Sequence, residues 1–179
     1  DIPNLYCPVI TDSDKALEVL ENMVAQMGAR YDAFSAVGVR NIESFHELSK
    51  KMGSKENVPY IVIVIDEMAD LLMTAGKPVE TAIVRLAQLG RAAGIHLVLA
   101  TQKPIVKVIT GLIKSNLPSR IAYQVTSGTD SRVILDNNGA EKLLGRGDLL
   151  MQYPGVSEPE RFHGAWISDE EIQTVCDSL

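Results

Sequence analysis

Two apolar runs with a helical segment between them constrain the fold of this chain more than any other feature. Residues Tyr60–Ile65 are almost all β-branched, and Ile95–Ala100 form a second apolar run. Such uninterrupted runs are typical of strands buried on both faces of a parallel sheet rather than of half-exposed antiparallel strands. Pro78 at a first helical turn and Gly94 as a C-terminal cap predict a helix between the two strands. Strand, helix, strand is a right-handed crossover unit, so the sequence predicts an α/β fold with a parallel sheet.

The flanking segments predict helices before this unit and shorter elements after it. Apolar residues at three- and four-residue spacing predict a long amphipathic helix that follows the possible cap Thr11-Asp12-Ser13 and ends near Gly38. A second helix follows Asn41, and Ser168–Glu171 has the pattern of a capping box for a final helix. The remaining predicted elements are a helix over 108–114, a third strand over 120–125, a helical turn over 129–135, and strands over 147–153 and 161–167. The result is a three-layer α/β domain, mostly parallel, with an antiparallel edge near its C-terminal end.

Composition is that of a soluble globular protein. Apolar residues make up 46% of the 179 residues, and no stretch approaches the roughly 18 consecutive apolar residues of a membrane span. The first residues lack the pattern of a secretory signal. Cys7 and Cys176 have no metal-ligand spacing, which favours free buried thiols in a reducing compartment and therefore a cytoplasmic location. We expect a helical N-terminal part over 1–57 and an α/β core over 58–179.

Charge is distributed unevenly along the chain. The whole chain carries a formal charge of -6, but the segment Thr81–Thr129 contains no Asp or Glu and six Lys or Arg. Subtracting +6 from -6 leaves -12 for the remainder. One interpretation is a surface that binds polyanions while the acidic body repels them. The alternative is a buried region that merely lacks acidic residues.

Acidic residues end the first predicted strand, and a hydroxyl and an amide end the second. Asp66 and Glu67 follow the first run directly, and Thr101 and Gln102 follow the second. Open α/β sheets bind ligands beyond the carboxyl ends of their strands, so the two tips are expected to share one site. Phosphate-hydrolysing motors use one carboxylate to hold hydrated Mg²⁺ and another to polarise the attacking water, which fits Asp66 and Glu67. Gln102 would contact a γ-phosphate or order that water. The alternative is a pair of strands that end at solvent in ordinary polar residues.

One arginine and one missing motif bear on this site. Arg91 ends the helix between the strands, where it would project past the sheet edge and reach a neighbouring subunit's nucleotide in a ring. Its alternative role is a cation that favours the helix C-terminus. No Gly-x-x-x-x-Gly-Lys-[Ser/Thr] motif occurs, and Gly76-Lys77 is followed by Pro78, which has no hydroxyl for Mg²⁺. Either the phosphate cradle precedes Asp1, or the chain does not hydrolyse nucleotide.

Five ordered stretches of the sequence closely resemble the motor domain of the FtsK/SpoIIIE family of bacterial DNA translocases. They are Ile63–Leu71, Arg85–Gln102, Val108–Lys114, Asp130–Asp136 and Gly139–Asp148. The resemblance covers essentially the whole chain and implies a RecA-like P-loop NTPase fold, of which this chain is the later part. It also implies a hexameric, ATP-driven pump of double-stranded DNA that acts in chromosome segregation at division or sporulation. The motor would be cytoplasmic, in a protein anchored in the inner membrane through a segment absent here.

The same resemblance implies roles for individual residues. Asp66 and Glu67 match the Walker B pair, with Asp66 holding Mg²⁺ through water. Gln102 matches the polar sensor, with Thr101 beside it in the ATP site, and Arg91 matches the proposed arginine finger. The Walker A segment would lie upstream of this chain, so we expect the fragment alone not to hydrolyse ATP.

The basic segment is expected to contact DNA. There is no Phe, Tyr or Trp from Ile61 through Ala122, so the segment offers no stacking platform for unpaired bases, and duplex backbone is the expected ligand. Lys103, Lys107 and Lys114 would contact phosphates near a central pore. Family members commonly have Arg where Lys103 stands and an acid where Lys107 stands, so both departures keep this segment basic. Two alternatives remain: a motor ATPase of a protein-secretion system, and a non-catalytic assembly fragment.

Overall fold

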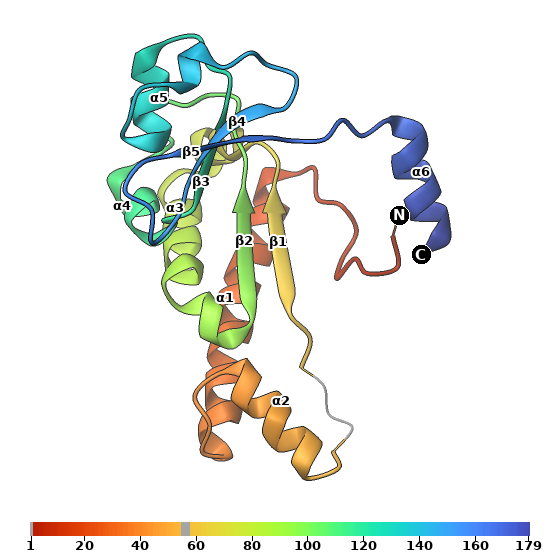
Figure 1. Cartoon of the computed structure of the whole chain (residues 1–179). Coiled ribbons are helices and arrows are strands. Elements are labelled where there is room, and N and C mark those ends of the chain that lie inside the picture. The colour runs from red at the N-terminus through yellow and green to blue at the C-terminus, as the bar shows by residue number, and fades with distance from the viewer. Residues whose placement is uncertain (1, 55–57) are drawn as a thin grey trace. The chain divides into compact units, whose positions relative to one another are not determined.

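The computed structural model describes residues 2–54 and 58–179 (Figure 1). The helices are α1 (Ser13–Ala36), α2 (Ile42–Lys51), α3 (Met68–Ala93), α4 (Gly111–Asn116), α5 (Gly128–Leu135), the 3-10 helix η1 (Ala140–Lys142) and α6 (Asp169–Ser178). The strands are β1 (Ile61–Ile65), β2 (Ile95–Leu99), β3 (Arg120–Tyr123), β4 (Asp148–Gln152) and β5 (Glu160–His163). The chain forms two compact units. The parallel unit comprises Asp12–Lys103 and Thr110–Asn116, and the antiparallel unit comprises the residues up to Thr11, Pro104–Ile109 and Leu117–Leu179.

The parallel unit is built on the predicted strand, helix, strand arrangement. β1 and β2 pair in parallel, with Ile61 opposite Ile95 and Ile65 opposite Leu99. Helices α1 and α3 lie against the same face of this pair (Figure 1). The contact is a buried apolar core, because the two helices present stripes at helical spacing. Its buried members are Leu20, Met23, Met27, Ile61, Val79, Ala82, Ile83, Leu86, Ala93 and Ile95.

Helix α3 begins earlier than the sequence predicted. It starts at Met68, directly after the strand tip, and bends at Gly76, where the backbone has φ 62° and ψ -140°. Only glycine adopts such a conformation at low cost, and Pro78 then lies in the first turn of the second helical segment. The predicted start at Pro78 is therefore right for the second segment and missed the first. The predicted cap at Gly94 is confirmed, in the left-handed conformation with φ 73°.

The last turn of α3 is tied to α1 by two side chains. Arg30 Nη1 donates to the carbonyl oxygen of Ala93 at 2.7 Å, and the Tyr31 hydroxyl donates to the carbonyl oxygen of Leu89 at 2.7 Å. Arg30 is buried, and its positive charge lies against the carbonyl group of Ala93 in the last turn of α3, where carbonyl groups lack a partner within the helix. These bonds fix the helix end that carries Arg91.

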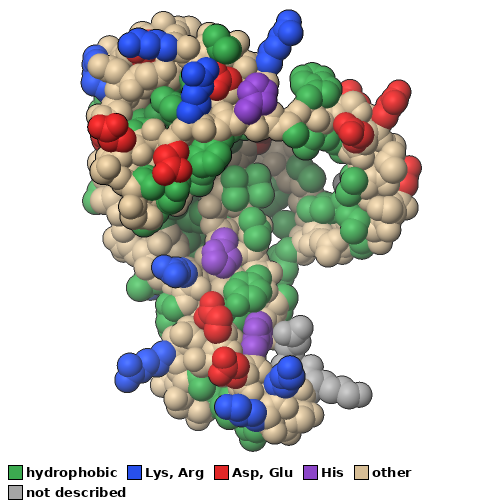
Figure 2. All heavy atoms as spheres, in the orientation of Figure 1, with side chains coloured by type: hydrophobic (Ala, Val, Ile, Leu, Met, Phe, Trp, Pro, Cys, Tyr) green, Lys and Arg blue, Asp and Glu red, His purple; other side chains and the backbone are tan. Residues whose placement is uncertain are grey.

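One face of the parallel strands is exposed. The opposite face carries Val62, Val64 and Val98, which are 59%, 67% and 51% exposed, and Figure 2 shows hydrophobic side chains at the surface over β1 and β2. The prediction that these strands are buried on both faces is therefore wrong for the described residues. The physical reason is that α1 and α3 cover the same side, and none of the helices described in this unit packs on the other.

The antiparallel unit contains the third predicted strand, but not as a partner of the parallel pair. β3 pairs antiparallel with β4, and β4 pairs antiparallel with β5. The buried carboxylate of Asp148 on β4 accepts two hydrogen bonds from Arg161 on β5, at 2.8 and 2.7 Å. These bonds, with one from the backbone N–H of Leu144, lower the pKa of Asp148 to about 2. The predicted antiparallel end of the fold is confirmed, and this ion pair links β4 to β5.

Several smaller predictions are tested by the structure. Asp12, Asn41 and Ser168 cap helices as expected, the last in a full capping box. Both cysteines are free, although each is only half-buried. Trp166, the single tryptophan of the chain, is 86% exposed. It follows the last strand in a short connector before α6, a helix without buried residues.

The boundary predicted between residues 57 and 58 touches residues 55–57. These lie outside the described residues, so the boundary stays a prediction. Within the described ranges, no helix combines the length and the apolar character needed to cross a bilayer.

Candidate functional site

Backbone hydrogen bonds join the two strand tips. The N–H of Ala100 donates to the carbonyl oxygen of Ile65 at 2.8 Å, and the N–H of Met68 donates to the carbonyl oxygen of Ala100 at 2.8 Å. The parallel ladder thus continues one step past both strands before the chain turns into α3. As a result, the residues that follow β1 lie beside those that follow β2, as the sequence predicted.

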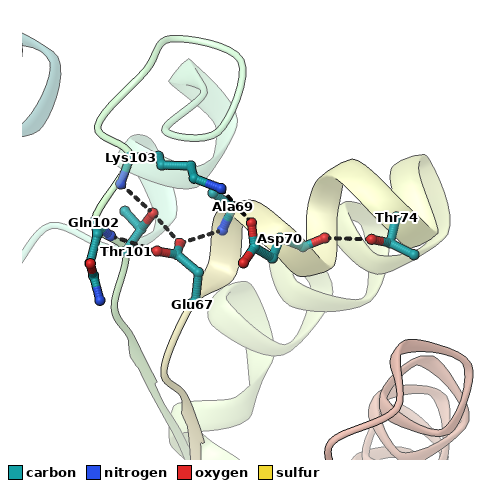
Figure 3. A network of polar contacts seen from close by, with 7 residues as sticks. All are labelled: Glu67, Ala69, Asp70, Thr74, Thr101, Gln102 and Lys103. Carbon is teal, nitrogen blue, oxygen red and sulfur yellow. Dashed lines mark hydrogen bonds and ion pairs between the residues drawn. The ribbon is translucent and has the colours of Figure 1, made fainter.

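Glu67 is the centre of the resulting network (Figure 3). Its Oε1 accepts from the Thr101 hydroxyl at 2.5 Å and from the N–H of Ala69 at 3.0 Å, and its Oε2 accepts from the N–H of Gln102 at 2.8 Å. The bond to Ala69 makes Glu67 the N-cap residue of α3. Glu67 therefore belongs to both tips: it starts the helix after β1 and holds the main chain after β2.

These contacts set the charge of Glu67. Partial desolvation raises the pKa of this carboxyl, but the hydrogen bonds from Thr101, Gln102 and Ala69, with the nearby charge of Lys103, outweigh it and hold the pKa below its usual range. Three donors to one carboxylate favour the ionised form. Glu67 is consequently an anion at neutral pH, the state that a group polarising water requires.

The network extends to a second acid that the sequence did not single out. Thr101 Oγ1 accepts from the backbone N–H of Lys103 at 3.1 Å, and Lys103 Nζ forms a 2.6 Å ion pair with Asp70 in the first turn of α3. Asp70 raises the pKa of Lys103 above its usual value. A start of α3 at Met68 places Asp70 one helical turn after Glu67. This spacing was missed because the helix was predicted to start at Pro78.

Asp66 and the side chain of Gln102 face outward. Asp66 is exposed, and none of the described residues holds its carboxylate by a hydrogen bond or ion pair. The Gln102 amide points away from Glu67 (Figure 3), so only its main chain joins the network. Within the described ranges, no three His, Cys, Asp or Glu side chains gather as metal ligands. A single exposed carboxylate fits Mg²⁺ bound mainly through phosphates and water, rather than a cage made by the protein.

Arg91 lies apart from this network. It is exposed in the last turn of α3, just before β2 begins, whereas Gln102 follows the other end of that strand. The five residues of β2 separate the two positions, a length of about 16 Å at the usual strand rise. The structure therefore does not bring Arg91 to the Glu67 cluster of its own chain.

The three predicted DNA contacts occupy different settings. Lys103 is paired with Asp70. Lys107 lies in the 104–109 loop of the antiparallel unit, is exposed, and forms no ion pair with any described residue. Lys114 is half-buried on α4, a helix that the Thr110 hydroxyl anchors to Glu80 of α3 at 3.0 Å. Of these settings, that of Lys103 includes bonds to the residues at the strand tips, through its ion pair with Asp70 and its N–H bond to Thr101.

Comparison with known proteins places these features in context. The profile of the FtsK/SpoIIIE family matches residues 1–106. The chain is 54% identical to the DNA translocase FtsK of Oceanobacillus iheyensis, over 98% of this chain and 23% of that protein. It is 52% identical to the DNA translocase SpoIIIE of Bacillus subtilis, over 99% of this chain and 23% of that protein. The solved pCW3 conjugation coupling protein TcpA, in its monomer form with ATPgS, matches with a TM-score of 0.80 and 31% identity, over 91% of this chain and 47% of that one.

Two facts follow from these matches. The structural likeness to TcpA confirms the RecA-like α/β fold that the sequence predicted. The chain spans 23% of the length of the two curated relatives, so it corresponds to one part of a much longer protein in each case.

Proposed function

The chain belongs to the FtsK/SpoIIIE family, and from this premise we propose that it is part of an ATP-driven motor that translocates double-stranded DNA in bacterial chromosome segregation, at division or sporulation. The observation that carries the proposal is the meeting of Glu67 with Thr101 and Gln102 at the carboxyl ends of two parallel strands. This is the edge at which open α/β sheets bind their ligands. The motor would be cytoplasmic, in a protein tethered to the inner membrane by a segment other than these residues.

The strand tips would carry the hydrolytic half of the nucleotide site. Asp66 would hold Mg²⁺ through water, and the ion, when bound to ATP, neutralises charge on the phosphates. Glu67 would orient and polarise the water that attacks the γ-phosphate, and its lowered pKa supports this role because the group stays ionised. Thr101 would keep Glu67 in place, and the outward Gln102 amide would contact the γ-phosphate. No glycine-lysine cradle occurs among the 179 residues, so another part of the protein would supply it, and this chain alone would not hydrolyse ATP.

Arg91 would act on a neighbouring subunit. Its distance along β2 from Gln102 argues against a role in its own chain's site, and its exposure leaves the guanidinium available to another copy. An arginine supplied in trans stabilises the charge that develops during phosphoryl transfer. A ring of six copies, as the resemblance implies, would place one such arginine at each subunit boundary.

The basic segment would bind the duplex. Lys103, Lys107 and Lys114 lie in a stretch without acidic or aromatic residues, which suits sequence-independent contact with phosphates better than stacking on bases. Hydrolysis at successive boundaries would move these contacts in turn and drag the DNA.

The direct test is ATP hydrolysis by the full-length protein with different polymers. Linear duplex DNA is expected to stimulate the rate more than single-stranded DNA. The proposed contacts bind the phosphates of a duplex and offer no aromatic surface on which unpaired bases would stack. An unfolded polypeptide serves as the comparison for a secretion motor. Stimulation by the polypeptide but not by the duplex would contradict the proposal and favour protein transport.

Replacement of Lys107 by Ala is expected to weaken duplex binding equally for all sequences. Removal of one lysine–phosphate interaction should reduce the slope of log K against log salt by about 0.9, because fewer counterions are released on binding. The measurement is duplex affinity of the full-length protein over a range of salt concentrations. Lys51→Ala, a change at an exposed lysine at the end of α2, is the matched control. A slope that stays the same in Lys107→Ala would show that Lys107 does not bind phosphate.

A further inference from the structure

Lys103 links the proposed DNA-binding segment to the proposed site of ATP hydrolysis. Its Nζ is 2.6 Å from Asp70 Oδ1, and its backbone N–H donates to Thr101 Oγ1 at 3.1 Å. The same Thr101 hydroxyl donates to Glu67 Oε1. One residue of the basic segment is therefore two hydrogen bonds away from the carboxylate that is proposed to activate water (Figure 3).

The ion pair with Asp70 is one that a phosphate can replace. Its side chains are 52% exposed at Lys103 and 65% exposed at Asp70. Exposed pairs of this kind contribute little to stability and are screened by salt, because water solvates both charges after separation. A duplex presents a dense row of phosphates, which attracts lysine more strongly than one surface carboxylate does. Lys103 can thus exchange Asp70 for DNA at low cost.

The same exchange affects Glu67. While Asp70 holds the Lys103 side chain, the N–H of Lys103 donates to the Thr101 hydroxyl, and this hydroxyl donates to Glu67. Glu67 also accepts hydrogen bonds from Ala69 and Gln102. Each of these donors occupies a lone pair that a water molecule would otherwise use. A Lys103 side chain drawn towards a phosphate would pull its backbone N–H away from Thr101. The hydroxyl would then be free to turn, which would release one lone pair of Glu67 Oε1 to water while the N–H of Ala69 keeps its own bond to that oxygen.

We infer that Asp70 is a positioning residue that couples DNA binding to hydrolysis: it holds Lys103 in the absence of DNA and thereby keeps the Thr101 hydroxyl on one lone pair of Glu67 Oε1. A DNA phosphate that takes Lys103 from Asp70 frees that lone pair for the attacking water. This inference rests on the proposed function, since it assigns a regulation to the same site. It differs from a purely structural role for Asp70, because it requires the effect to pass through Thr101.

The test is Asp70→Asn in the full-length protein, with ATP hydrolysis measured without DNA and with saturating duplex. The variant releases Lys103 without DNA, so the rate without DNA is expected to rise by about fivefold, the lower end of typical coupling between sites, and stimulation by DNA to fall by the same factor. The rate is measured without DNA because Asp70→Asn also removes the repulsion between Asp70 and DNA phosphates, which by itself changes DNA binding. Asp14→Asn is the matched control, because Asp14 is also an exposed acid in the first turn of a helix.

A second arm repeats the comparison in a Thr101→Val background, where the hydroxyl is absent but the branched shape remains. The inference predicts that Asp70→Asn then has no further effect on the rate without DNA, since coupled residues are not additive. An unchanged or lower rate in Asp70→Asn, the same rise in Asp14→Asn, or a full rise in the Thr101→Val background would each overturn it. A wild-type protein whose hydrolysis does not respond to duplex DNA would instead contradict the proposed function itself.

Discussion

Glu67→Gln in the full-length protein is expected to lower kcat for ATP hydrolysis on the order of 10²- to 10⁴-fold, the usual contribution of a general base. Gln has nearly the same shape as Glu but cannot accept a proton. Binding of ATP should remain, because the proposed phosphate and Mg²⁺ contacts lie elsewhere. The measurements are steady-state hydrolysis and, separately, nucleotide affinity, and translocation along DNA should stop together with hydrolysis.

The surroundings of Glu67 add detail to this prediction. The carboxylate accepts from Ala69, Thr101 and Gln102, and an amide NH₂ in place of one oxygen cannot accept from the donors on that side. Because the pKa of Glu67 is lowered, the wild-type residue is ionised throughout the neutral pH range, so the loss should not depend on pH there. Glu43→Gln, a change at a first-turn acid of α2, is the control and should have no effect on the rate. Hydrolysis within tenfold of the wild-type rate would reject Glu67 as the base.

The neighbourhood of the two strand tips was predictable because it depends on short-range patterns. A run of branched apolar residues fixes a strand, the next such run after a helix fixes a parallel partner, and their carboxyl ends must then meet. From this, the proximity of Glu67 to Thr101 and Gln102 followed without knowledge of any side-chain contact. The bonds themselves run through the main chain of Gln102 and the hydroxyl of Thr101, a choice that the residue types alone do not make.

What was not predicted depends on features whose local signal is weak or absent. The start of α3 at Met68 needs Glu67 as a cap, yet capping residues are more often Ser, Thr, Asp or Asn. Asp70 was missed for the same reason. The exposure of Val62 and Val64 follows from which face the helices cover, and a continuous apolar run does not distinguish one covered face from two. Trp166 is exposed although it is large and apolar, because such a residue is buried only where a neighbouring element packs on it.

Arg91→Ala is expected to reduce hydrolysis by about 10³-fold or more, the contribution of an arginine supplied to phosphoryl transfer. The residue is exposed at the end of α3, and the length of β2 separates it from the Glu67 cluster of its own chain. Its loss should leave nucleotide affinity and folding nearly unchanged, because its side chain contacts none of the described residues by a hydrogen bond or ion pair. Arg85→Ala, a change at another exposed arginine of α3, is the control. A loss of less than tenfold would show that Arg91 acts only as a cation at the helix C-terminus.

Mixing two inactive variants then shows on which chain Arg91 acts. If each site combines Glu67 of one subunit with Arg91 of the next, a mixture of Glu67→Gln and Arg91→Ala proteins contains boundaries in which both residues are intact. In a random equimolar mixture these are half times half, or about a quarter of all boundaries, and each has a complete phosphoryl-transfer site. Hydrolysis should therefore recover well above the rate of either variant alone. If Arg91 instead served its own chain, every site would lack one of the two residues, and the mixture would stay as inactive as its components. The separation of Arg91 from Gln102 along β2 predicts recovery.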